Sequence, residues 1–275
     1  MGRKLVIFDV DGTLLAHPQE LIPDSALTAL SELRKNGHII GVASGRDMDT
    51  HYSCGYRDVI DPDVIIHLNG ARVTDGDDIV FEHRVDDGLL HRLYDFCLEH
   101  GISLGMIYKE ADYFMIPSWR DKADSYMGIK AARNYRPFEE IFEKNIPVNA
   151  LCLCGIVEEA REAIEGSFKG VRVVGFNSKY AADVVEEGIS KAEGLRRLCS
   201  HLGIDISDTY AFGDSQNDVE ILDAVGTGIA MGNGMDAAKE HADLIADHIM
   251  QDGVYKMCVQ LGLIDDVLGL CSGDK

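Results

Sequence analysis

Three short apolar runs in the N-terminal part of the chain end in polar residues. Residues 5–8, LVIF, form a continuous apolar stretch that predicts a strand buried on both faces, and residues 38–44 and 64–71 repeat the pattern. Between the first two runs, apolar residues recur at helical spacing until Asn36-Gly37. Strand, helix and strand in this order predict a parallel, doubly wound sheet, whose ligands collect beyond the carboxyl ends of the strands.

The middle of the chain has a different rhythm. A strand at residues 79–85, a helix and two further strands predict a βαββ unit, and residues 147–186 predict the same order again. The alternation of strands and helices then returns. We therefore predict an α/β fold with a Rossmann-like, doubly wound parallel sheet core and an inserted α+β domain with a duplicated βαββ order. The predicted bounds are 1–82 and 188–275 for the core and 83–187 for the insertion.

Composition excludes several classes of partner. The 275 residues include 47 acidic and 26 basic side chains, a net charge of −21 that disfavours nucleic acid and anionic membranes. No apolar run has the length of about 20 residues that a membrane-spanning helix needs, and no signal peptide is recognisable, so we expect a cytoplasmic protein. The seven cysteines are scattered and contain no CxxC pair, which argues against a disulfide framework or a zinc site.

Carboxylates gather at the predicted strand ends. Asp9 and Asp11 follow the first strand, and Asp214 and Asp218 follow a later one, in GDSQND. Two carboxylates about 4 Å apart repel by about 4 kcal/mol at an effective dielectric of about 20, so a cation between them is expected. Hard oxygen ligands of this kind favour Mg²⁺. The sequence therefore predicts a magnesium site made by these four aspartates.

Groups that suit a phosphate accompany the carboxylates. Ser44 offers a hydroxyl, Gly45 allows close approach of backbone N–H groups, and Lys191 stands at a predicted helix N-terminus. Lys191, Arg46 and Mg²⁺ would together balance the four negative charges of the aspartates. A phosphorylated ligand can then enter without meeting net negative charge.

Four motifs in this order resemble those of the haloacid dehalogenase (HAD) superfamily. They are DVDGT at 9–13, ASGR at 43–46, ISKAEGL at 189–195 and GDSQND at 213–218. Asn69-Gly70-Ala71, the segment 230–243 and the position of the inserted domain resemble the Cof-type phosphatases of its subfamily IIB. The resemblance implies that the insertion is a cap domain of type C2B.

The resemblance also implies roles for individual residues. Asp9 would be the nucleophile and Asp11 the general acid/base. The side chain of Asp9, the backbone carbonyl of Asp11 and Asp214 would hold Mg²⁺, with Asp218 helping directly or through water. Ser44, Gly45 and Lys191 would bind phosphate, with Asn217 close by.

The expected function is that of a Mg²⁺-dependent phosphatase. It would hydrolyse small phosphomonoesters, such as sugar phosphates or phosphorylated cofactors, through an aspartyl-phosphate intermediate. Two alternatives stay open at this point: a phosphomutase like the phosphomannomutases, which return the phosphoryl group to a sugar, and a non-catalytic sensor of phosphorylated ligands. The sequence indicates neither the individual substrate nor an oligomeric state.

Candidate substrate residues each have a second interpretation. Arg46 suits substrate binding or a salt bridge, and Asn69 suits substrate binding or the turn before Gly70. Trp119 and Arg120 lie in a basic segment, residues 117–136. This segment either faces the active site or forms a solvated surface loop, and its charge favours the surface loop. None of the ten histidines has metal-ligand spacing, and none is assigned a chemical role.

Overall fold

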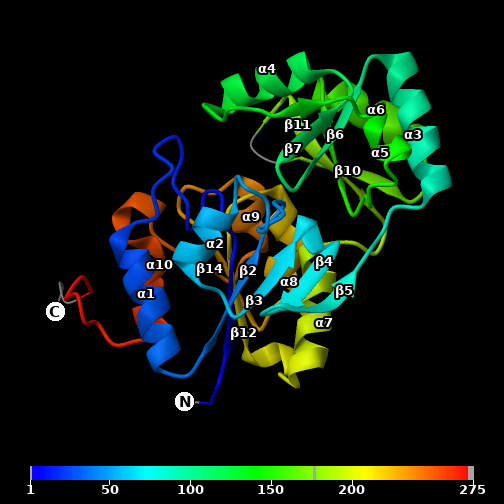
Figure 1. Ribbon diagram of the computed structural model, residues 1–275. Helices are drawn as coiled ribbons and strands as arrows, with labels where there is room; N and C mark the ends of the chain where they lie inside the picture. Colours follow the sequence, from blue (N-terminus) through cyan, green and yellow to red (C-terminus); the bar gives the residue numbers. More distant parts are fainter. Residues whose placement is uncertain (1, 176–177, 272–275) are drawn as a thin grey trace.

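The computed structural model describes residues 2–175 and 178–271. Its strands form two sheets, one of eight strands and one of six. Figure 1 shows the six-stranded sheet and its helices as a separate layer above the larger sheet. We call this upper part the cap and the lower part the core.

The core sheet has the order β14-β13-β12-β1-β2-β3-β4-β5. The strands from β14 to β3 are parallel, whereas β4 and β5 are added as antiparallel neighbours. In chain order, the strands are β1 (Leu5–Phe8), β2 (Ile39–Ala43), β3 (Val64–His67), β4 (Arg72–Asp75), β5 (Asp78–Glu82), β12 (Thr209–Gly213), β13 (Thr227–Ala230) and β14 (Leu244–Ile245).

Helices cover both faces of the core sheet because its strands are apolar on both sides. In β1, Val6 and Phe8 join one hydrophobic cluster, while Leu5 and Ile7 join another. Figure 1 shows α1 and α10 on one side of the sheet and α7 and α8 on the other. The helices of the core are α1 (Asp24–Lys35), α2 (Cys54–Ile60), α7 (Lys191–Leu202), α8 (Val219–Ala224), α9 (Asp236–His241) and α10 (Gly253–Gln260), with short 3₁₀ turns at η1 (Leu68–Gly70), η2 (Ile206–Asp208), η3 (Gln216–Asp218) and η4 (Ile249–Gln251). The predicted doubly wound core is confirmed.

One predicted strand belongs to the other sheet. The strand expected at residues 79–85 as the start of the inserted domain is β5, which pairs with β4 in the core sheet. The first cap unit therefore begins with helix α3, and only the second, β9-α6-β10-β11, is a complete βαββ unit within one sheet. Local pattern indicates a strand here but carries no information about its pairing partner.

The cap sheet has the order β10-β11-β9-β6-β7-β8. Helices α3 and α6 pack on one face, in a cluster that includes Leu153 and Ala182, whereas α4 packs on the other face with Cys154 and Ala181. The cap elements are α3 (Asp87–His100), β6 (Ser103–Tyr108), β7 (Ala111–Phe114), α4 (Pro117–Met127), β8 (Tyr135–Arg136), α5 (Glu140–Glu143), β9 (Leu151–Cys154), α6 (Val157–Ser167), β10 (Val171–Gly175) and β11 (Ala181–Glu186).

The solvated-loop interpretation of the basic segment 117–136 holds only in part: Lys122, Lys130 and Arg136 are exposed, but the segment is not a loop throughout. It contains α4 and β8, and its Arg133 is nearly buried between Asp124 and Asp112, at 2.7 and 3.2 Å. The Asp112 side chain is fully buried. Charges that pair with each other can be buried, and a count of charged residues does not reveal such pairing.

Several contacts join the cap to the core. The Tyr52 hydroxyl donates to Asp112 Oδ2 at 2.7 Å, and Arg172 forms an ion pair with Glu220 at 2.7 Å. The chain passes from the core to the cap between β5 and α3, and it returns to the core between β11 and α7. The domain bounds given above stay a prediction.

Among the described residues, every helix is too short or too polar to cross a lipid bilayer.

Candidate active site

The centre of the core sheet places the first two aspartates. Asp9 directly follows β1, which lies between β12 and β2, and its backbone N–H continues the sheet by donating to Phe212 at 2.9 Å. Asp9 is only 5% exposed. Gly12 then turns the chain with a φ of +92°, a conformation that glycine adopts without strain. The sheet therefore orients Asp9 at its carboxyl edge, as predicted from the strand pattern.

Three carboxylates converge at this edge. One oxygen each of Asp9, Asp214 and Asp218 lies within 4.8 Å of the other two. Asp214 follows β12, and Asp218 ends the 3₁₀ turn η3, where its Oδ2 accepts from the backbone N–H groups of Asp214 and Ser215 at 2.9 and 3.0 Å. Asp214 Oδ1 is buried without a hydrogen-bond partner among the described residues. An unsatisfied buried oxygen in a cluster of carboxylates fits a hard divalent cation.

Lys191 supplies positive charge to the same point. It is the first residue of α7, is 1% exposed, and its Nζ donates to Asp9 Oδ1 at 2.7 Å and to Asp218 Oδ1 at 2.6 Å. The side chain of Ser190 caps the helix by accepting from the N–H of Glu193 at 3.3 Å. A fully buried ammonium with two carboxylates as partners is a structural element of the site as well as a candidate phosphate ligand.

Lys191 does not fully compensate the negative charge of Asp9 and Asp214. Burial raises the pKa of Asp9 well above its usual range, and the carboxylates of Asp218 and Asp11 raise it further, although Lys191 opposes them. Burial, with Asp9 and Asp218 nearby, likewise raises the pKa of Asp214. The same carboxylates raise the pKa of Lys191 against the effect of its burial. An additional cation would lower the pKa of both carboxyl groups.

The Asp11 side chain points to different partners. Its two oxygens accept from Arg46 Nε and Nη2, both at 2.6 Å, and Oδ1 also contacts His17 Nε2 at 2.7 Å. Burial alone would raise the pKa of Asp11, but Arg46 and His17 lower it below its ordinary value. This arrangement holds Asp11 ionised. Of the two interpretations of Arg46, the structure shows the salt bridge.

His17 was assigned no chemical role from the sequence, but it contacts the site. It lies in the connection between β1 and α1 and reaches Asp11 directly. Its position six residues after Asp11 follows no metal or triad spacing, so the sequence pattern held no signal for it.

Two of the residues predicted to bind phosphate, Ser44 and Gly45, follow strand β2. Ser44 follows β2, is 1% exposed, and its Oγ accepts from the N–H of Arg46 at 3.1 Å. Gly45 has little free space above it, because a Cβ there would lie 2.9 Å from Asp183 and 3.4 Å from Asn69. A side chain at this position would therefore collide with Asp183.

Asn69 links the core strands to the aspartate loop and to the cap. Its Oδ1 accepts from Asn217 Nδ2 at 3.0 Å, and its Nδ2 donates to Asp183 Oδ2 at 2.7 Å. Asn217 in turn accepts from the Ser215 hydroxyl at 2.6 Å. Asn69 has a φ of +53°, so it also serves the turn that was its second interpretation. Asp183, from β11 of the cap, was not among the predicted residues.

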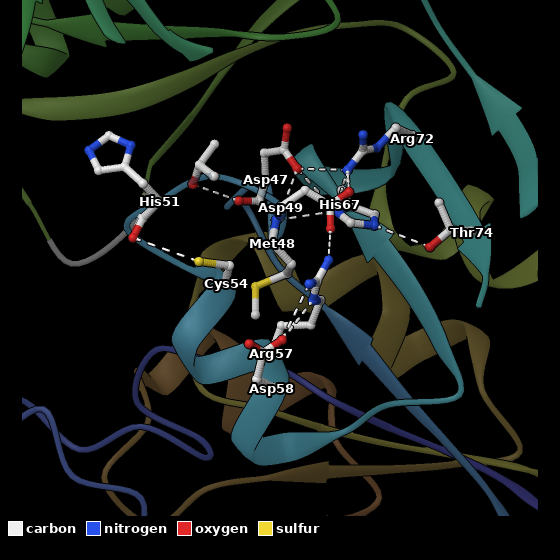
Figure 2. A network of polar contacts seen from close by, with 11 residues as sticks. Asp47, Met48, Asp49, His51, Cys54, Arg57, Asp58, His67, Arg72 and Thr74 are labelled. Carbon is white, nitrogen blue, oxygen red and sulfur yellow. Dashed lines mark hydrogen bonds and ion pairs between the residues drawn. The ribbon is translucent and has the colours of Figure 1, made fainter. Parts of the chain in front are cut away.

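A second acidic cluster lies in the loop that follows Arg46 in the chain. Figure 2 shows Asp47 and Asp49 beside His67, with the Arg72 guanidinium next to the two carboxylates. Arg72 Nη2 donates to Asp47 Oδ1 at 2.7 Å and also contacts Asp49. His67 Nδ1 accepts from the N–H of Met48 at 3.2 Å, and burial lowers the pKa of this ring. Arg72 and Arg57, which pairs with Asp49, thus supply positive charge to this cluster, and Arg72 fastens the loop after Ser44 to β3 and β4.

The two cap candidates lie in α4. Arg120 is largely buried and pairs with Asp124 at 3.0 Å, with its Nη1 3.8 Å from Cys152 Sγ. The Trp119 ring packs against Tyr180, at a centroid distance of 6.4 Å, and Lys122 lies 4.5 Å from its centroid. Their contact with a substrate stays a prediction.

Fold and site together define a doubly wound α/β enzyme core with carboxylates and a buried lysine at the strand ends, beneath an inserted cap. The model of the family described as haloacid dehalogenase-like hydrolase matches residues 6–258. The chain belongs to this family. The resemblance read from the four motifs is thereby confirmed.

Relatives and solved structures agree over nearly the whole chain. A Bacillus subtilis (strain 168) protein named "Putative phosphatase YkrA" is 30% identical over 266 residues, which cover 96% of this chain and 100% of that protein. The 5-amino-6-(5-phospho-D-ribitylamino)uracil phosphatase YcsE of the same organism is 27% identical, covering 92% and 93%. The structure of BT4131, a HAD subclass IIB sugar phosphatase, has a TM-score of 0.84 and 25% identity, and the match covers 95% of this chain and 100% of that one.

These likenesses confirm the predicted fold class and the enzyme class, a phosphatase of the HAD superfamily. The roles of individual residues, the metal and the substrate are separate questions.

Proposed function

We propose that this protein is a Mg²⁺-dependent phosphatase that hydrolyses small phosphomonoesters through a phosphorylated Asp9. The observation that carries the proposal is the convergence of Asp9, Asp214 and Asp218 around one point, with Lys191 buried against two of them. Family membership supports the reaction class.

The proposed metal ligands are the side chains of Asp9, Asp214 and Asp218 and the backbone carbonyl of Asp11. The unsatisfied Asp214 Oδ1 and the oxygen-only donor set fit Mg²⁺. A bound Mg²⁺ would polarise a phosphoryl oxygen and neutralise part of its charge. Lys191 would hold Asp9 in place and contribute a second positive charge to the phosphoryl group.

Asp9 is the proposed nucleophile because it is fixed by the sheet and by Lys191. Its carboxylate oxygen would attack phosphorus, forming an oxygen–phosphorus bond while the bond to the ester oxygen breaks. Water would then hydrolyse the aspartyl-phosphate and release inorganic phosphate. The Ser44 hydroxyl and the N–H groups near Gly45 would orient the phosphoryl oxygens, with Asn217 close by.

Asp11 is the proposed general acid/base. Ionised by Arg46 and His17, it is ready to take a proton from the hydrolytic water. To protonate the leaving alkoxide in the first half-reaction, it must gain a proton and exchange at least part of its contact with Arg46. The two half-reactions thus require two states of the Asp11–Arg46 pair.

The proposed substrates are small phosphorylated metabolites, because relatives named for such substrates include a sugar phosphatase and an HMP-PP phosphatase. We expect several members of a panel of about a hundred phosphomonoesters to release inorganic phosphate with Mg²⁺, since small contacts discriminate between substrates only about 10- to 200-fold. None should release phosphate in EDTA. Activity that survives EDTA would contradict the metal assignment. Transfer of the phosphoryl group to a second sugar hydroxyl, dependent on a bisphosphate activator and without release of inorganic phosphate, would identify a phosphomutase. Binding without turnover would identify a sensor.

Metal binding has a readout that needs no substrate. We expect Mg²⁺ at about 100 times its dissociation constant to stabilise the protein by about 2.7 kcal/mol, or about 5 °C in melting temperature. Asp214→Asn should remove this shift, because it removes the negative charge of the carboxylate that carries the unpartnered oxygen. Asp223→Asn, an exposed position in α8, should retain it. An equal Mg²⁺ shift in both variants would exclude Asp214 as a ligand.

A further inference from the structure

Asp183 brings a negative charge from the cap to the edge of the phosphate site. Its Oδ2 accepts from Asn69 Nδ2 at 2.7 Å, across the boundary between cap and core. The same oxygen lies 2.9 Å from the position of a Cβ on Gly45, the residue that follows Ser44. A phosphomonoester bound at Ser44 and Gly45 would therefore place the atoms next to its phosphate beside Asp183.

The surroundings of Asp183 contain little compensating charge. Burial raises its pKa to about 6, although Asn69, Lys191 and Arg120 act in the opposite direction. Asn69 is a neutral donor, Arg120 is paired with Asp124 at 3.0 Å, and Lys191 donates to Asp9 and Asp218. This partly buried carboxylate would gain from a further hydrogen-bond donor or positive charge.

We propose that Asp183 selects the leaving group of the substrate. It accepts a hydrogen bond from a hydroxyl or ammonium group close to the phosphorylated carbon, and it repels a carboxylate or second phosphate at the same place. The preferred substrates are thus polyol or amino-alcohol phosphates rather than phosphorylated acids. This inference rests on the phosphatase function proposed above and assigns the substrate class within it.

A structural role for Asp183 predicts a different result. If its hydrogen bond with Asn69 only held the cap on the core, its loss would slow every ester to a similar degree. A selecting carboxylate instead changes the ratio between esters of different charge, because like charges in a partly desolvated site repel. The ratio of two substrates measured on one preparation also cancels any difference in the amount of folded enzyme.

Three esters of equal length give a direct test: ethanolamine phosphate, 2-hydroxyethyl phosphate and 2-phosphoglycolate, which end in an ammonium, a hydroxyl and a carboxylate. For the unaltered protein with Mg²⁺, we expect kcat/KM to be at least about tenfold higher for ethanolamine phosphate than for 2-phosphoglycolate, within the range of small-group discrimination. 2-Hydroxyethyl phosphate should lie between them.

Asp183→Asn removes the charge and keeps an oxygen that can accept from Asn69. We expect it to lower the ratio of kcat/KM, ethanolamine phosphate over 2-phosphoglycolate, by about tenfold. Glu187→Gln is the matched control: it removes one negative charge from an exposed residue just after β11 and should leave the ratio as it is.

The outcomes separate this inference from the proposed function. A preference of the unaltered protein for 2-phosphoglycolate, or a ratio unchanged in Asp183→Asn, would overturn the role of Asp183 and leave the phosphatase intact. The first of these measurements needs no variant, so it decides even if Asp183→Asn does not fold. If neither these esters nor p-nitrophenyl phosphate release phosphate, both the role of Asp183 and the proposed phosphatase function are overturned.

Discussion

Replacing Asp9 with asparagine is expected to reduce Mg²⁺-dependent hydrolysis of p-nitrophenyl phosphate by at least about 10⁴-fold, because the amide cannot form the proposed aspartyl-phosphate. Phosphate release in the steady state measures this loss. Asparagine has nearly the same shape and can still accept from Lys191, so the fold should persist.

The stability of this variant provides an independent check. Burial raises the pKa of Asp9, so without metal the fold favours the neutral side chain that asparagine mimics, and the melting temperature in EDTA should not fall. Asp58→Asn, an exposed aspartate in α2, is the control for the loss of one negative charge and should remain fully active. Full activity of Asp9→Asn would refute the assignment of the nucleophile.

Replacing Gly12 with alanine is expected to reduce activity by about 10²-fold or more. A Cβ at this position would lie 2.2 Å from Asp214 Oδ2, and φ is +92°. Asp214 must then move, and displacement of a reacting group by about 1 Å costs about that factor. The Mg²⁺-induced rise in melting temperature should shrink in parallel, because the displaced carboxylate is a proposed metal ligand.

Gly37→Ala separates the contact from the backbone strain. Gly37 also has a positive φ, +79°, but no atom lies within 4 Å of a Cβ placed there. We expect this variant to lose about 1 kcal/mol of unfolding free energy and to keep its activity. If both variants lost activity equally, the close approach of Gly12 to Asp214 would not be the cause.

Much of the site was predictable because its residues mark the ends of regular elements. Asp9, Ser44 and Asp214 each follow a buried apolar strand, and parallel strands bring such ends to one edge of the sheet. The convergence of distant motifs therefore followed from local patterns and one topological rule. The placement of Lys191 at a helix N-terminus followed from its capping serine in the same way.

The missed features depend on contacts between segments that are far apart or irregular. His17 lies in a connection without periodicity, and Asp183 lies on a strand whose pattern does not tell which partner it faces. Arg133 and Asp124 are buried as a pair. The prediction that these charged residues are exposed to solvent was therefore wrong. In each case the deciding interaction joins two elements rather than neighbours in the chain.

By itself, the sequence determined the alternation of strands and helices, the doubly wound core, the four aspartates and the family resemblance, because burial and capping leave a periodic record along the chain. Only the tertiary structure decided that β5 joins the core sheet, that Arg46 and His17 hold the Asp11 side chain, and that Asp183 reaches across from the cap. Strand pairing and side-chain partners are set by the packing of whole elements, which no local pattern encodes.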